Sequence, residues 1–160
     1  MEPPLASGLL RSALFVSVVL IGVQLGVSYA HFMQMNGKLQ LLLESYILVQ
    51  NVLISYRTKL AFIEIPTLVA TTLAVFLLRA DRSRFILAAI GLACLVFMWL
   101  VWFFFIQPIN AEIDTWTVAT APPNWSQLRA RWHEFHLLRL GLAAVAMCAV
   151  VSAALGREAG

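Results

Sequence analysis

Four apolar stretches, each about twenty residues long, constrain this chain more than any other feature. They cover residues 12–31, 60–79, 85–106 and 135–155 of a 160-residue sequence. A helix needs about 20 predominantly apolar residues to cross a bilayer. Only 12% of the residues are charged, roughly half the share that a soluble domain carries. The pattern excludes a soluble or disordered protein and predicts a single all-α membrane domain over 1–160, a bundle of four transmembrane helices in the lipid bilayer.

The connections between these stretches differ in length. Between the first two, residues 39–56 are apolar, but the segment is short for a span and contains Glu44, Gln50 and Asn51. We therefore expect an additional interfacial helix in this first long connection. The other long connection covers residues 107–134, and a helix is expected to begin near Asn124. No other connection approaches these two in length.

Basic residues indicate the orientation of the bundle. Arg79, Arg82 and Arg84 crowd the short link between the second and third spans, Arg11 precedes the first span and Arg157 follows the fourth. Positive charges in short loops favour the cytoplasmic side, so we expect both termini to be cytoplasmic. The longer connections on the opposite side carry basic residues that oppose this assignment: Lys38, Arg57, Lys59, Arg129 and Arg131.

Charge and cysteine usage exclude two classes of function. The net charge is only +3, and no basic stripe lies on a water-soluble face, so nucleic acid is not an expected partner. Cys94 and Cys148 both lie in apolar runs and neither belongs to a CxxC motif. A disulfide oxidoreductase therefore has no support in the sequence.

Polar residues gather at one end of the predicted bundle. His31 ends the first span, Glu64 lies about one turn inside the second, Asn110 follows the third, and His136 and Arg139 open the fourth. Ionisable groups inside a membrane are costly and usually face a cavity or a partner. The layer therefore predicts a site at the outer end of the bundle. Anchoring at helix ends, or an Arg139–Glu64 pair, would also account for these residues.

The residue types at this level are compatible with three chemistries. A transition metal ion could be held by His31, Glu64, His133 and His136. His31 and His136 could be axial ligands of a haem, although no haem motif supports this. Alternatively, Glu64 or His136 could act as a general base while Asn110 and either Arg131 or Arg139 hold a developing oxyanion.

Two groups of motifs carry a family resemblance. In the second half these are Pro108-Ile109-Asn110, Trp116, and a W-x5-R-W-x3-H-x2-R pattern that starts at Trp125 and ends at Arg139. The first half contributes Ala30-His31, Gly37-Lys38-Leu39, Tyr46, Val49-Gln50 and Glu64. With these motifs the chain resembles the anthrone oxygenase-like family of small four-span membrane proteins, in a bacterial branch whose members mostly lack an assigned function.

The resemblance implies a four-helix membrane bundle in the bacterial inner membrane. It also implies oxygenation of an electron-rich aromatic such as an anthrone, without a bound cofactor. Once deprotonated, an anthrone is a carbanion that can react with O₂ directly. The protein would then need only a base, an oxyanion partner and a dry pocket.

These observations give one principal expectation about function. We expect an integral membrane oxygenase or related oxidoreductase that acts on a small hydrophobic molecule, aromatic or quinone-like, at the outer end of the bundle. The base would be His136 or Glu64, and the anion would be positioned by Asn110, Arg131 and Arg139. The pocket would be lined or covered by His31, Tyr46, Gln50, Trp116, Trp125 and Trp132. No cofactor is expected, with a transition metal ion as the alternative.

The competing expectation is a non-catalytic membrane module. Such a chain would be an accessory subunit or a small-molecule binder, and its polar layer would be a buried network that fixes the register of the helices. A homo-oligomer or a membrane-complex partner is compatible with either expectation.

Overall fold

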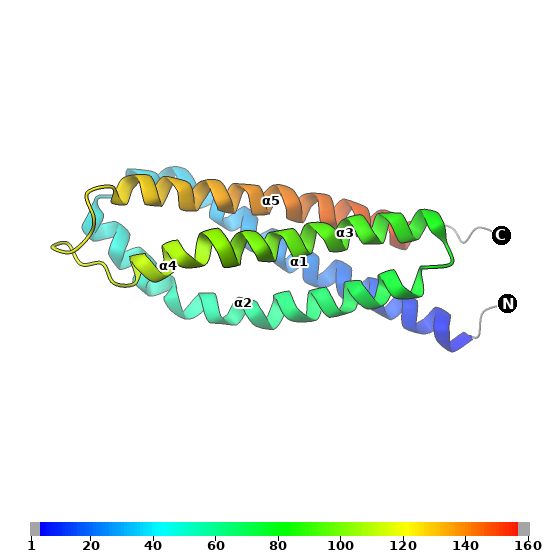
Figure 1. Ribbon diagram of the computed structural model, residues 1–160. Coiled ribbons are helices and arrows are strands. Elements are labelled where there is room, and N and C mark those ends of the chain that lie inside the picture. Colours follow the sequence, from blue (N-terminus) through cyan, green and yellow to red (C-terminus); the bar gives the residue numbers. More distant parts are fainter. Residues whose placement is uncertain (1–3, 157–160) are drawn as a thin grey trace.

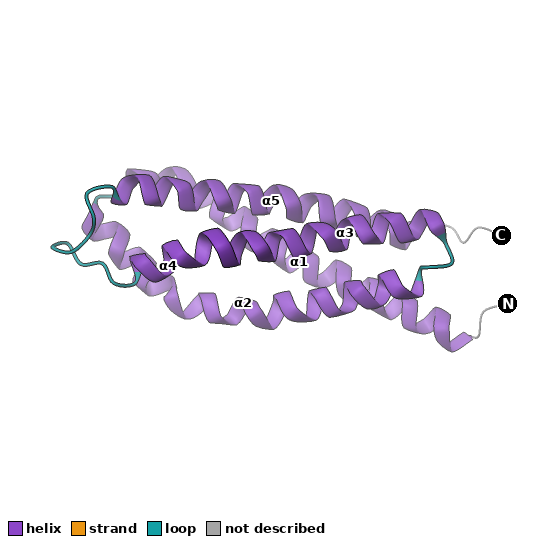
Figure 2. Cartoon of the chain, in the orientation of Figure 1, coloured by secondary structure: helices purple, strands orange, loops and turns teal. Residues whose placement is uncertain are grey.

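Helices make up nearly all of the described chain. The computed structural model describes the backbone of residues 4–156 and the side chains of 7–52 and 62–156. No strand occurs within these residues (Figure 2). Arg157 and the side chains of Arg57 and Lys59, used above to argue orientation, lie outside the described residues. The elements are α1 (Pro4–Gln40), α2 (Leu43–Leu77), α3 (Arg82–Val101), η1 (Trp102–Ile106), α4 (Gln107–Ile113) and α5 (Trp125–Leu155).

The elements form an up-and-down four-helix bundle. The segments α3, η1 and α4 follow one another without a break and act as one column (Figure 1). Around the bundle α1 packs against α2, α2 against α3, α3 against α5, and α5 against α1. The start of α1 and the end of α5 lie at the same end of the bundle (Figure 1). The predicted all-α four-helix bundle is thereby confirmed.

The outer surface is that of a membrane protein. Three helical runs are long and apolar enough to cross a bilayer, namely Ser7–Gln40, Arg82–Ile113 and Trp125–Leu155. In α2, the apolar stretch found among the described residues is Phe62–Leu77. Large apolar side chains, Phe104 among them, face outward along these helices. An exposed apolar surface of this extent marks a membrane or interaction surface rather than one that faces water.

Small residues let α5 approach its neighbours closely. Ala143, Ala146, Ala149 and Ala153 are buried at helical spacing along one face of α5. In α3, Gly91 faces the same helix, and a Cβ atom there would lie 2.5 Å from Cγ2 of Val150. Small interfacial residues are a common basis of helix packing in lipid, where apolar burial alone does not drive association.

The separate interfacial helix expected over 39–56 requires correction. Helix α1 continues to Gln40, the chain turns at Leu41–Leu42, and α2 then runs unbroken from Leu43 to Leu77. The α2 sequence contains no glycine, and its single proline, Pro66, lies in the helix interior rather than in a first turn. Membrane helices tolerate such prolines because neighbouring groups satisfy the freed backbone carbonyl. The helices accordingly extend beyond the predicted span boundaries.

A π-helical turn joins α3 to α4 within the third column. Over Trp102–Ile106 the backbone hydrogen bonds join residues five apart instead of four, and the Gln107 N–H donates to the Trp102 carbonyl. Pro108 follows directly and lacks the N–H that an α-helix would use at this point. Beyond it, α4 buries Asn110. The connection predicted over 107–134 is therefore mostly helical, and its irregular part is limited to residues 114–124. Helix α5 begins after Asn124, as predicted.

Candidate active site at the histidine end

One face of α5 carries most of the buried polar side chains at the end of the bundle opposite the termini. Arg129, Trp132, His133, His136 and Arg139 are all buried. Their spacing of three to four residues places them on the same side of the helix. The neighbouring Arg131, which was predicted to hold an oxyanion, lies on another face and is exposed. This placement corrects its assignment to the site.

The indole of Trp132 is the centre of this end. Its Nε1 donates a hydrogen bond to Asn110 Oδ1 over 2.8 Å. Three imidazoles surround the ring, with centroid distances of 5.3 Å to His31, 5.0 Å to His133 and 4.0 Å to His136. Lys38 Nζ lies 5.8 Å from the ring centroid, within cation–π range. We call His31, Lys38, Trp132, His133 and His136 the histidine cluster.

Several polar atoms of the histidine cluster have no partner within the described part of the chain. These are His31 Nδ1, Lys38 Nζ, His133 Nε2 and His136 Nε2. Buried side-chain polar atoms are usually hydrogen-bonded to protein or water. The rings of His31 and His136 lie only 4.2 Å apart, so two imidazoles in contact each carry one nitrogen without a partner among the described residues. The cluster thus presents proton acceptors and a cation that a bound molecule could use.

Glu64 is engaged in an ion pair that crosses the bundle. Its carboxylate Oε1 accepts a hydrogen bond from Arg139 Nη2, and the two side chains are only 12% and 6% exposed. The pair joins α2 to α5, two helices that are not adjacent around the bundle. A cavity of about 10 Å³ lies beside Glu64 and Gln24, the size of about one water molecule. The pairing that the sequence left open is present, and it occupies one oxygen of the predicted base.

Arg129, which the sequence analysis counted only as a loop charge, holds the α1–α2 turn. Nη1 donates to the carbonyls of Lys38 and Leu41 over 3.1 and 2.7 Å, and Nη2 donates to that of Leu39 over 2.8 Å. The last carbonyls of a helix lack partners within the helix and carry its partial negative charge. The buried guanidinium of Arg129 gives these carbonyls hydrogen-bond donors and a positive charge.

The predicted pocket residues divide between the Arg129 environment and the histidine cluster. The Arg129 guanidinium lies 4.6 Å from the ring of Trp125 and 5.4 Å from that of Tyr46, whose hydroxyl accepts a hydrogen bond from Gln50 over 2.7 Å. Tyr46, Gln50 and Trp125 thus pack near the turn. Trp116 is buried in the same apolar core as Trp132 and attaches the 114–124 loop to the bundle.

The side chains at this end do not form the predicted metal or haem site. Within the described residues, no three of the His, Cys, Asp and Glu side chains are placed to hold a metal ion, which corrects the set His31, Glu64, His133 and His136. The contact between the His31 and His136 rings also leaves no space for a porphyrin between them. The donor set therefore does not fit either group.

Fold and site together define an all-helical membrane protein with a buried cluster of imidazoles and cations at one end. Residues 56–149 match the family described as Anthrone oxygenase. Because this match covers more than half of the chain, the protein belongs to that family, which confirms the resemblance seen in the sequence. Searches of curated proteins and of solved structures each gave no match. The matched segment includes Glu64, Asn110, Trp132 and His136, whereas His31 and Lys38 lie before it.

Proposed function

We propose that the protein is a membrane oxygenase that converts the methylene carbon of a small, hydrophobic, anthrone-type aromatic into a carbonyl at the histidine cluster. One observation carries this proposal. The imidazoles of His31 and His136 pack against each other and against Trp132, and each has one buried nitrogen without a hydrogen-bond partner among the described residues. The family supplies the reaction class, and the site supplies groups suited to it.

The first step is removal of a proton from the methylene carbon. His136 Nε2 is the base, because it is buried on the face of α5 that turns toward the cluster and has no hydrogen-bond partner within the described residues. The resulting enolate carries its charge on the carbonyl oxygen. Lys38 Nζ has no hydrogen-bond partner in the part of the chain that is described, and the Asn110 amide still has its NH₂ after accepting from Trp132. Both can donate to that oxygen.

The second step is addition of O₂ to the carbanion carbon. The peroxide that forms takes the proton from His136 and becomes a hydroperoxide. Loss of the second methylene proton, with cleavage of the O–O bond, gives the new carbonyl and water. One substrate and one O₂ thus yield one quinone and one water, so no external reductant and no bound cofactor are needed. A site closed to bulk water protects the carbanion from reprotonation.

A substrate must enter the buried histidine cluster from outside, and the segment that would move is the loop 114–124 at this end of the bundle (Figure 1). The loop 114–124 is held by short-range hydrogen bonds such as the one between the Thr117 and Thr120 hydroxyls. Trp116 is its buried anchor. Replacement Trp116→Ala should therefore change KM more than kcat.

The test is a stoichiometric assay with the purified, full-length protein in lipid nanodiscs. With anthrone as the probe, wild type should consume one O₂ per quinone formed, and this ratio should survive treatment with a chelator. Metal analysis accompanies the assay. A stoichiometric transition metal that is lost in the His31→Ala/His136→Ala double variant would overturn the cofactor-free reaction. Absence of quinone above the buffer rate would favour the non-catalytic module, for which the buried Glu64–Arg139 pair is the supporting observation.

A further inference from the structure

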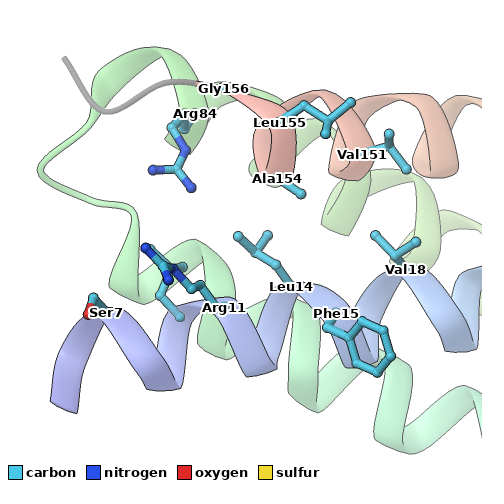
Figure 3. A pocket seen from close by; sticks show the side chains of 11 residues that line it. Ser7, Arg11, Leu14, Phe15, Val18, Arg84, Val151, Ala154, Leu155 and Gly156 are labelled. Carbon is cyan, nitrogen blue, oxygen red and sulfur yellow. The ribbon is translucent and has the colours of Figure 1, made fainter. Parts of the chain in front are cut away.

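A second cavity lies at the other end of the bundle, between the start of α1 and the end of α5. Its volume is about 450 Å³, within the range of about 300–1,000 Å³ typical of ligand pockets. Most of its wall is apolar, and the remainder is formed by Ser7 and two arginines (Figure 3). The apolar lining comes from the start of α1 and the end of α5: Leu10, Leu14, Phe15, Val18, Val151, Ala154 and Leu155.

The two arginines face each other across this cavity. Arg11 extends from α1 and Arg84 from α3, and their guanidinium groups point toward the same space (Figure 3). Arg11 forms no ion pair within the described residues, and Arg84 has only a loose contact of 3.9 Å with Asp81. Among the described residues these two like charges converge without a close counter-ion, and such charges repel each other and attract an anion.

Arg84 is held in this position by the surrounding backbone. Its Nε donates to the Ala153 carbonyl over 2.9 Å, and the residue is only 8% exposed. Gly156 makes room for the arginine stem, because a Cβ atom there would lie 3.0 Å from Cγ of Arg84. The bond to Ala153 uses Nε, so the terminal nitrogens remain available to the cavity.

We propose that this cavity binds one anionic phospholipid, with the phosphate between Arg11 and Arg84 and an acyl chain along Leu14, Phe15 and Val151. The apolar wall and the cationic mouth match an amphiphile rather than a free ion. Basic pockets between membrane helices are known to select anionic headgroups. The lipid would fasten the start of α1 to the end of α5, far from the histidine cluster.

The experiment titrates the purified full-length protein in detergent with phosphatidylglycerol, with phosphatidylcholine and with inorganic phosphate, and follows binding and the unfolding temperature. Phosphatidylglycerol should bind at least about tenfold more tightly than phosphatidylcholine, since both carry a phosphate but the choline cation of phosphatidylcholine would lie beside the two arginines and repel them. Replacement Arg11→Gln should remove this preference. The matched control Arg82→Gln removes an exposed charge at the same end, outside the cavity, and should retain the preference.

A filling variant separates a lipid from a free anion. Ala154→Phe should block phosphatidylglycerol binding because the acyl chain loses its space, while both arginines remain. Equal binding of the two lipids would overturn the proposal, as would equal losses from Arg11→Gln and Arg82→Gln. Stabilisation by inorganic phosphate that matches the lipid effect and survives Ala154→Phe would also overturn it, in favour of a free-anion site.

Discussion

At each end of the bundle a buried arginine binds backbone carbonyls near the end of a helix, but the two arginines differ in which nitrogens remain available. At the histidine end, Arg129 binds the carbonyls that end α1, and at the termini end Arg84 binds the Ala153 carbonyl near the end of α5. Arg129 donates to backbone carbonyls from both terminal nitrogens, whereas Arg84 donates to a backbone carbonyl from Nε. The terminal nitrogens of Arg129 are thus committed to the backbone, and its buried Nε alone lacks a partner within the described residues, whereas Arg84 still has terminal donors for a ligand.

The two ends also differ in packing: the histidine end is closely packed, and the other end contains a cavity. Around Trp132 the polar groups of α1, α4 and α5 are buried against each other, and their unpaired atoms lie inside the protein. Around Arg11 the helices leave a cavity of about 450 Å³. Burial with unpaired acceptors suits proton transfer, and an open cationic cavity suits binding. The following experiments can break or sharpen this division.

The largest effect is expected at the proposed base. Replacement His136→Gln should lower kcat by about 100-fold or more, the usual contribution of a general base. Because His136 Nε2 has no hydrogen-bond partner to lose among the described residues, the free energy of unfolding should change by less than about 1 kcal/mol. Steady-state kinetics and thermal unfolding of the same preparation give both values. Unchanged kcat with a large loss of stability would make the histidine end structural.

Breaking the Glu64–Arg139 pair should cost the most stability. Replacement Glu64→Gln leaves a buried guanidinium without its counter-charge, a change worth about 3–5 kcal/mol when both side chains are buried. The double variant Glu64→Gln/Arg139→Gln removes both charges and should recover most of that loss. Chemical unfolding in mixed micelles measures these differences. A single variant as stable as wild type would contradict the buried pair.

The contrast between the two arginines can be measured directly. Replacement Arg129→Lys keeps the charge but cannot reach three carbonyls, so we expect a loss of about 2–4 kcal/mol. Arg84→Lys gives up one carbonyl bond, and its loss should be about 1 kcal/mol. Arg131→Lys, on the exposed face of α5, is the control and should have no measurable effect. Equal losses at positions 129 and 84 would remove the distinction between the ends.

Overpacking in the middle of the bundle should change stability alone. Replacement Gly91→Ala forces Val150 to move, since the new methyl group would lie 2.5 Å from its Cγ2 atom. Overpacking of this kind costs about 1–3 kcal/mol, while neither end should change its ligand binding or activity. Gly141→Ala is the control, because a Cβ atom there meets nothing within 4 Å. A loss of activity in Gly91→Ala would contradict this expectation and would show that packing in the middle of the bundle affects the histidine cluster.

Local sequence determines which parts of this fold can be predicted. The four apolar stretches predict the bundle because span length depends only on nearby residues. The break at Leu41–Leu42 has no glycine, proline or asparagine to mark it, and an arginine 88 residues away holds it. The preceding Asn36-Gly37 pair looks like a turn, yet remains helical. A turn held by a distant side chain leaves no local signal.

The site shows the same limit. His136 and Asn110 stand out in the sequence because polar residues at the ends of apolar stretches are conspicuous. Arg129 and Arg131 are both basic and two positions apart, and only the phase of α5 separates the buried one from the exposed one. The three- and four-residue spacing from Arg129 to Trp132, His136 and Arg139 was the available signal. Lys38 lies about two helical turns after His31 on α1, but its other neighbours in the cluster come from α5, and only the packing of the two helices places it beside Trp132.

The most direct test of the central claim isolates proton removal from the reaction with O₂. Under anaerobic conditions in D₂O, wild-type protein in nanodiscs should exchange the methylene hydrogens of anthrone about 100-fold faster than buffer, as expected of a positioned base. Arg131→Gln should match wild type, and His136→Gln should fall to the buffer rate. Wild-type exchange no faster than buffer, or equal exchange by His136→Gln and wild type, would contradict a catalytic histidine end.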